Sequence, residues 1–177
     1  MADKTKIQWS DYTLNFMVGC SKVSAGCDNC YAVDVANALE VRFQSEKYKG
    51  LTVINHPPSP SSTKEGAMLD WTGEIRIIDE LILKPLHLKK PRKIFVNSMS
   101  DLFHEKILTD INLRNAVWRF FLVMLKANHH QYQILTKRAH IMRDIIKEFM
   151  ISAGLTELPK HIRLGESVEN QRTANVS

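Results

Sequence analysis

Hydrophobic residues fall into two kinds of run that alternate along the chain. Short apolar runs typical of buried strands occupy residues 13–18, 73–78, 93–96, 132–135 and 161–165. Longer runs with apolar residues at helical spacing lie at residues 29–43, 79–90, 109–127 and 140–152. Strands that alternate with helices pair in parallel through right-handed crossovers, so the pattern predicts an α/β fold, either a sheet or part of a (β/α) barrel.

Helical spacing also assigns side chains within two of these helices. In residues 29–43, the apolar positions at helical spacing are Tyr31, Val35, Leu39 and Phe43. In residues 109–127, the positions expected on the inner side are Ile111, Val117, Phe121 and Leu125. Residues 49–65 combine three prolines with several serines and threonines, so we expect a loop there.

Polar residues that suit ligand binding follow four of the predicted strands. They are Cys20, Cys27 and Cys30; Asn97, Ser98, Ser100 and Asp101; Thr136, Lys137 and Arg138; and Ser167, Glu169 and Asn170. Loops that leave the carboxyl ends of parallel strands lie on one rim, so we expect the four groups to converge on one face.

Each group also has a purely structural explanation. Ser100 and Asp101 suit a helix cap, as do residues 167–170. Lys137 and Arg138 suit a solvated helix start, although two cations there oppose the helix dipole and indicate a nearby anion. It is the joint placement of the four groups after parallel strands that favours a site.

Composition narrows the class of protein. At 177 residues and 44% hydrophobic content, the chain is expected to form one globular domain over residues 1–177. Its longest apolar stretch, near residues 117–125, contains Arg119 and is too short to cross a bilayer. The start of the chain has no apolar signal segment, so we expect a cytoplasmic protein. The net charge of +5 permits a nucleic-acid partner, but the basic residues are spread along the chain.

The three cysteines all lie within eleven residues, in the pattern C-x6-C-x2-C. An odd number of thiols in a reducing compartment argues against disulfides, and cysteines that merely fill a core do not cluster around Gly26 in a loop. Three thiolates suit an iron-sulfur cluster with one open iron, whereas a closed zinc site needs a fourth ligand such as His104. A lone histidine is more often a hydrogen-bonded structural residue.

Together these motifs resemble a known group of proteins. A cysteine loop directly after the first strand of an α/β partial barrel resembles the radical S-adenosylmethionine (SAM) superfamily. More closely, residues 7–11, 15–32, 95–104, 133–138 and 165–171 resemble the three-cysteine-motif proteins of unknown function from bacteriophages and bacteria. The chain differs from the commoner radical-SAM pattern in its longer first cysteine spacing and in having residues 97–101 where a Gly-Gly-Glu stretch is usual.

The resemblance implies a [4Fe-4S] cluster on the three cysteines, with SAM bound at the open iron. One electron passed to the sulfonium of SAM would give a 5'-deoxyadenosyl radical that takes hydrogen from a substrate. The expected SAM contacts are Ser98, Ser100 and Asp101 near its amino-acid end and Lys137 near its carboxylate, with Asp101 accepting from the ammonium. Asn97, Thr136, Ser167, Glu169 and Asn170 complete the expected cofactor-binding residues.

The resemblance identifies no substrate, and a nucleic acid or a nucleotide fits the positive charge. An electron donor would also be required. A different class of protein stays open: a non-catalytic zinc-binding module that contacts nucleic acid or protein. The chain stops where a helix should cover the fifth strand, so we also expect a truncated partial barrel, either inactive or completed by a partner chain.

Overall fold

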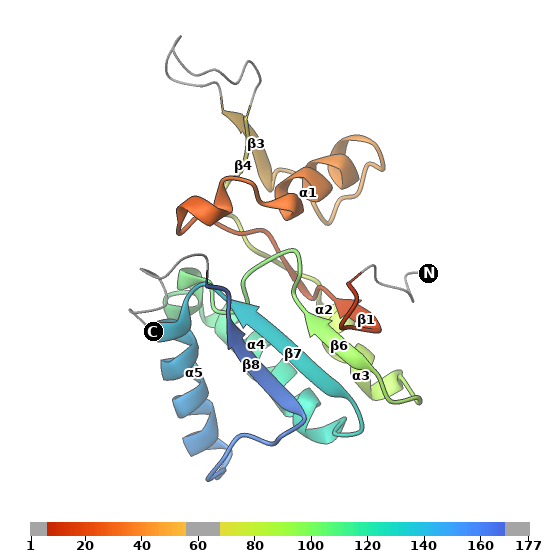
Figure 1. Cartoon of the computed structure of the whole chain (residues 1–177), viewed down its shortest axis with the longest axis vertical. Helices are drawn as coiled ribbons and strands as arrows, with labels where there is room; N and C mark the ends of the chain where they lie inside the picture. The colour runs from red at the N-terminus through yellow and green to blue at the C-terminus, as the bar shows by residue number, and fades with distance from the viewer. Residues whose placement is uncertain (1–6, 56–67, 169–177) are drawn as a thin grey trace.

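A four-stranded parallel sheet forms the centre of the molecule, which we describe from a computed structural model for residues 7–55 and 68–168. The strand order is β1-β6-β7-β8, and all three pairings are parallel (Figure 1). The strands are β1 (Tyr12–Leu14), β6 (Lys93–Val96), β7 (Gln131–Thr136) and β8 (Ile162–Glu166). The prediction of an α/β fold is therefore confirmed, and the described residues form no closed barrel.

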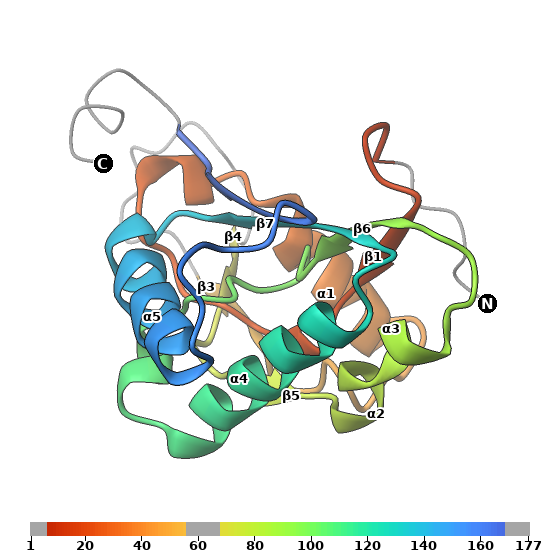
Figure 2. The same ribbon diagram turned by 90° about the horizontal axis from the view of Figure 1, so that it is seen from below.

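Helices cover one face of this sheet. They are α2 (Asp79–Ile82), α3 (Lys84–His87), α4 (Ile111–Lys126) and α5 (Ala139–Ser152), and Figure 2 shows α4 and α5 lying side by side beneath the strands. Their apolar sides meet the sheet in the main core, where Phe120, Tyr132 and Phe149 are fully buried. Asp110 begins α4 as predicted, because its carboxylate accepts from the backbone N–H groups of Asn112 and Leu113. No described helix is long and apolar enough to cross a membrane.

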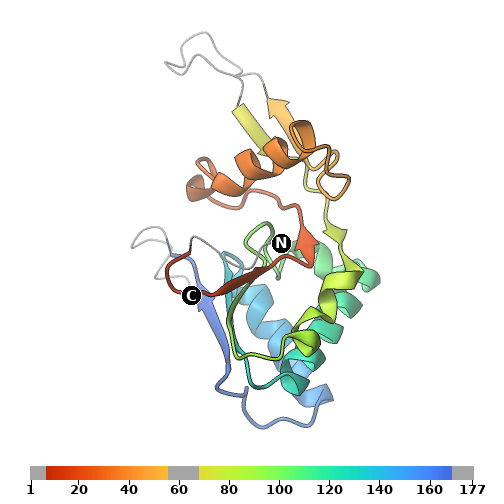
Figure 3. The same ribbon diagram turned by 90° about the vertical axis from the view of Figure 1, so that its right-hand side faces the viewer.

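A smaller unit stands above the carboxyl edge of the sheet (Figures 1 and 3). It contains the 3-10 turn η1 (Ala25–Cys27), α1 (Tyr31–Val41), β3 (Thr52–Asn55) and β4 (Met68–Trp71), with β3 and β4 antiparallel. A second core holds it together, in which Ala36, Leu51 and Trp71 are buried. The antiparallel pair β2 (Met17–Val18) and β5 (Arg76–Ile77) joins this unit to the rest.

Two predicted strands differ from the structure. The run at residues 13–18 divides into β1 and β2, because the backbone N–H of Met17 donates to the side-chain Oδ1 of Asn97 instead of continuing the ladder. The run at residues 73–78 is not part of the parallel sheet, because its central residues form β5 and pair antiparallel with β2. The parallel sheet thus has four strands where five were expected.

The apolar residues at helical spacing in the predicted helix 29–43 are not the ones that are most buried. Tyr31 is 57% exposed, Phe43 lies beyond the end of α1 and is 72% exposed, and the residues that α1 buries are Ala32, Val33 and Ala36. In α4 the prediction holds for Val117 and Phe121, which are fully buried, but Ile111 is exposed. The loop predicted at residues 49–65 contains β3, and its remainder from residue 56 lies outside the described residues.

Candidate functional site

The cysteine loop begins at a glycine whose place only glycine suits. Gly19 has φ of +94°, and a Cβ atom there would lie 2.0 Å from the backbone oxygen of Glu74. Its N–H donates to the backbone oxygen of Met99 at 3.0 Å, which ties the loop to the segment after β6. Cys20 therefore leaves β2 at a fixed point beside the end of the parallel sheet.

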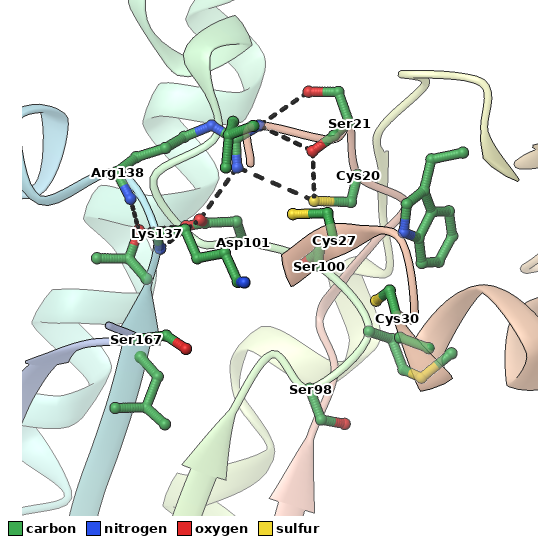
Figure 4. A pocket seen from close by; sticks show the side chains of 16 residues that line it. Cys20, Ser21, Cys27, Cys30, Ser98, Ser100, Asp101, Lys137, Arg138 and Ser167 are labelled. Carbon is green, nitrogen blue, oxygen red and sulfur yellow. Dashed lines mark hydrogen bonds and ion pairs between the residues drawn. The ribbon is translucent and has the colours of Figure 1, made fainter. Parts of the chain in front are cut away.

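All three cysteines line one cavity of about 150 Å³ between this loop and the carboxyl ends of β6 and β7 (Figure 4). None of them forms a disulfide, and each is partly exposed. Cys27 ends η1, and Cys30 is the residue directly before α1. The rest of the cavity lining is Ser21, Val23, Ala32, Trp71, Ser98, Met99, Ser100, Asp101, Leu135, Thr136, Lys137, Arg138 and Ser167.

The predicted convergence of distant segments is largely present in this cavity. Six of the expected cofactor-binding residues line it together with the cysteines: Ser98, Ser100, Asp101, Thr136, Lys137 and Ser167. Asn97 is buried beside it at a φ of +59°, and its Nδ2 atom has no hydrogen-bond partner. Glu169 and Asn170 lie outside the described residues.

On one side of the cavity, Arg138 connects the polar residues through its hydrogen bonds. Its side chain is only 3% exposed, yet it carries a full charge. Nε donates to Glu105 at 2.6 Å, Nη1 to Asp101 at 3.1 Å, and Nη2 to the backbone oxygen and hydroxyl of Ser21 at 3.1 and 2.8 Å. Nη1 also lies 4.0 Å from the sulfur of Cys20. The guanidinium thus links the cysteine loop to the segments after β6 and β7.

Asp101 is held by four protein donors. Its Oδ1 accepts from the backbone N–H of Phe103 and the hydroxyl of Thr136, at 2.9 and 2.7 Å. Its Oδ2 accepts from the backbone N–H of Lys137 and from Arg138, both at 3.1 Å. A carboxylate has about four acceptor positions, so the protein itself uses them.

His104 and Glu105 complete this network through Ser21. The Nδ1 atom of His104 accepts from the backbone N–H of Lys106, so the proton lies on Nε2, which contacts the Ser21 hydroxyl at 2.9 Å. That hydroxyl donates to Glu105 at 2.6 Å. Burial and the charge of Arg138 lower the pKa of His104. Both of its ring nitrogens are engaged within the protein.

The pKa values of Cys20 and Cys27 are shifted in opposite directions. Burial raises the pKa of the Cys20 thiol, and the nearby Arg138 only partly offsets this. Burial also acts on Cys27, but backbone hydrogen bonds of Val23 and Ser24, together with the charge of Lys137, hold its pKa below the ordinary value. The surroundings therefore favour the thiolate of Cys27 and disfavour that of Cys20.

Sequence reasoning missed the importance of three residues. The sequence places Arg138 among the polar groups at the rim but gives it no specific contact, and it singles out neither Ser21 nor Glu105. One signal is present, because two cations at the start of α5 (Ala139–Ser152) indicate a nearby anion, and Arg138 pairs with Asp101 and Glu105. Within the described ranges, no three His, Cys, Asp or Glu side chains are grouped closely enough to hold a metal ion.

The fold and the cavity define an α/β protein with three unpaired cysteines at the carboxyl edge of a parallel sheet. The model of the family described as "Protein of unknown function (DUF5131)" matches residues 4–177, so the chain belongs to that family. No curated protein and no solved structure matches the chain.

Proposed function

We propose that the chain is a radical-SAM-like iron-sulfur protein built on a partial (β/α) barrel. The observation that carries the proposal is the cavity itself. Three cysteines without disulfides line it where parallel strands end, opposite Lys137 and Arg138. Cys20, Cys27 and Cys30 would hold a [4Fe-4S] cluster, which together with bound SAM supplies one-electron chemistry on the sulfonium and hydrogen abstraction from a substrate.

The chemistry of the three cysteine side chains, as ligands, supports an iron-sulfur cluster. Thiolates are its usual ligands, and a thiol gives up its proton when it binds metal. Arg138 lies 4.0 Å from the Cys20 sulfur, and the charge of Lys137 lowers the pKa of Cys27. Asp101 and Glu105 balance the charge of Arg138, so it is Lys137 that favours a negatively charged group in the cavity, which a cluster held by three thiolates would be.

A closed zinc site has less support. It requires a fourth ligand on one ion, and both nitrogens of His104 are already engaged by Lys106 and Ser21. Three thiolates complete the protein ligands of a cluster with one open iron, whereas zinc would still lack its fourth ligand.

Within this proposal, Asp101 has a supporting role and Lys137 has a binding role. The Asp101 carboxylate is filled by protein donors, so we assign it to holding Arg138 and the turn before α5 instead of accepting from the SAM ammonium. Lys137 lines the cavity and remains the proposed partner of the SAM carboxylate. Ser98 and Ser100 lie at the same rim. The substrate is unknown, with nucleic acid or a nucleotide proposed, and an external electron donor is required.

The test is calorimetric titration of the anaerobically reconstituted protein with SAM. We expect Lys137→Ala to weaken SAM binding about tenfold, because one charge-assisted contact of roughly 1.4 kcal/mol is lost. Lys147→Ala is the matched control, since Lys147 is exposed on α5 and does not line the cavity. Unchanged affinity in Lys137→Ala would remove this residue from the site, and absence of SAM binding in the iron-loaded protein would contradict the SAM proposal.

A further inference from the structure

The guanidinium of Arg138 directs all five of its N–H donors at the protein itself. Nε has one hydrogen, which goes to Glu105, and Nη1 has two, which face Asp101 and the sulfur of Cys20. Both hydrogens of Nη2 go to Ser21, one to its backbone oxygen and one to its hydroxyl. Three of the five donors are thus directed at Cys20 and Ser21 (Figure 4), and none is left for a substrate.

These contacts hold Cys20 in place from both sides. The residue after it, Ser21, is bound through its backbone oxygen by Arg138 at 3.1 Å. The residue before it, Gly19, donates from its N–H to the backbone oxygen of Met99 at 3.0 Å. The Cys20 sulfur is therefore kept 4.0 Å from Nη1 of an arginine whose side chain is almost fully buried.

Three formal charges meet beside this sulfur. Nη1 of Arg138 lies 3.1 Å from Oδ2 of Asp101, and Nε lies 2.6 Å from Oε2 of Glu105. The Asp101 side chain is 8% exposed and the Glu105 side chain 51%, so water and salt screen the charge of Asp101 less. In the intact network the two carboxylates balance the guanidinium, and removing any one member changes the net charge beside Cys20 by one unit.

A charge near a ligand sulfur changes the reduction potential of an iron-sulfur cluster. Reduction adds one electron to the cluster. A nearby cation and N–H groups directed at the sulfur therefore stabilise the reduced form, whereas a nearby carboxylate destabilises it. Both effects are strongest where little water is present, and Arg138 and Asp101 are the most buried charges of the network.

We infer that Arg138, Asp101 and Glu105 set the reduction potential of the cluster at Cys20, with Arg138 as the residue that raises it. The inference rests on the proposed function, because it needs the cluster on the three cysteines. Arg138 is a positioning residue, since its donors hold Cys20 and Ser21 and do not reach a substrate. In the reduction step the external donor loses one electron and the cluster gains it, and Arg138 exchanges neither an electron nor a proton.

The test is a redox titration of the anaerobically reconstituted protein, in which absorption and electron paramagnetic resonance spectra give the midpoint potential of the cluster. Arg138→Gln removes the positive charge, so its cluster should be about tenfold harder to reduce, a shift of about 59 mV to lower potential. Asp101→Asn and Glu105→Gln each remove a negative charge and should raise the potential. The rise should be larger in Asp101→Asn, because Asp101 is the more buried carboxylate.

Arg143→Gln is the matched control for Arg138→Gln. Arg143 also belongs to the region of α5, but it pairs with Asp144 at the surface and its side chain is 75% exposed. It does not line the cysteine cavity. The midpoint potential of Arg143→Gln should equal that of the wild type.

The opposite signs separate an effect of charge from structural damage. All three substitutions break the same network, so a loosened loop that admits water would shift the potential of every variant in one direction. A lower potential in Arg138→Gln together with higher potentials in the two carboxylate variants supports the inference. Shifts of one sign in all three variants, or no shift, would overturn it.

A second comparison decides the matter if Arg138→Gln does not fold, because that variant leaves the buried Asp101 without its charged partner. Ser21→Ala removes the hydroxyl that contacts both Glu105 and Arg138 but changes no charge. A higher potential in Glu105→Gln than in Ser21→Ala supports the inference, and an equal or lower one overturns it. A wild-type protein that takes up no iron refutes the proposed function and this inference with it, whereas a cluster that does not respond to these charges refutes the inference alone.

Discussion

At the scale of single residues, the buried charge of Arg138 dominates the site. Its guanidinium holds Asp101, Glu105 and Ser21 at once, with almost no contact with water. Arg138→Ala should lower the free energy of unfolding by about 3–5 kcal/mol, because the buried Asp101 carboxylate loses its charged partner. Urea denaturation measures this change.

The control for Arg138 is another arginine of the same region. Arg143 lies on α5 and pairs with Asp144 at the surface, where its side chain is 75% exposed. Arg143→Ala should change the free energy of unfolding by less than about 0.5 kcal/mol, as is usual for exposed ion pairs. A similar small change in Arg138→Ala would show that the buried network does not stabilise the fold.

Gly19 offers a second test at this scale. Gly19→Ala should be more destabilising than Gly73→Ala, because both glycines have positive φ but only Gly19 would bring a Cβ atom into contact with backbone. We expect about 1 kcal/mol for Gly73 from the backbone conformation alone, and several for Gly19. Equal losses in thermal or urea unfolding would mean that the close approach to Glu74 is unimportant.

At the scale of elements, the turn η2 (Glu105–Leu108) ties the segment after β6 to the cysteine loop. Glu105 accepts from Ser21 and from Arg138. Burial acts against ionisation, but these hydrogen bonds and the charge of Arg138 lower the pKa of Glu105 from 4.5 to about 2. The contact therefore stabilises the fold fully above pH 4.5, and its contribution is lost as the pH falls toward 2.

Glu105→Gln should consequently show a weaker acid dependence than the wild type. Between about pH 5 and pH 3, the wild type should lose more free energy of unfolding than this variant, because its unfolded state takes up a proton that the folded state resists. Glu157→Gln, at an exposed position, should follow the wild-type profile. If the free energy of unfolding had the same pH dependence in the wild type and in Glu105→Gln, the stabilising contact of Glu105 with Ser21 and Arg138 would be contradicted.

The sequence predicted the positions of some elements well. The run at residues 93–96 is β6 as expected, and α4 begins after its Asp110 cap. In α1 the small residues Ala32, Val33 and Ala36 pack on the second core, whereas Tyr31 and Val35 are exposed. Helical spacing marks an apolar stripe, but it does not tell whether protein or ligand covers that stripe.

At the scale of the whole molecule, the sequence predicts that the loops after the parallel strands lie together. It does not predict which side chains in those loops contact each other. Residues from the ends of β6, β7 and β8 do line one cavity with the cysteines. The sequence could not show that Asp101 turns toward Arg138, since that contact joins residues 37 positions apart through side-chain geometry. This contact is the reason why we propose that Asp101 supports Arg138 instead of contacting the SAM ammonium.

The central claim is that the three cysteines hold one iron-sulfur cluster, and metal analysis tests it most directly. Iron, sulfide and zinc are counted in the anaerobically reconstituted protein, in the single variants Cys20→Ala, Cys27→Ala and Cys30→Ala, and in Asn29→Ala as the exposed control in the same loop. We predict about four iron and four sulfide ions per chain in the wild type and in Asn29→Ala, with iron loading lost in each cysteine variant while the fold persists. One zinc ion per chain and no iron would contradict the account.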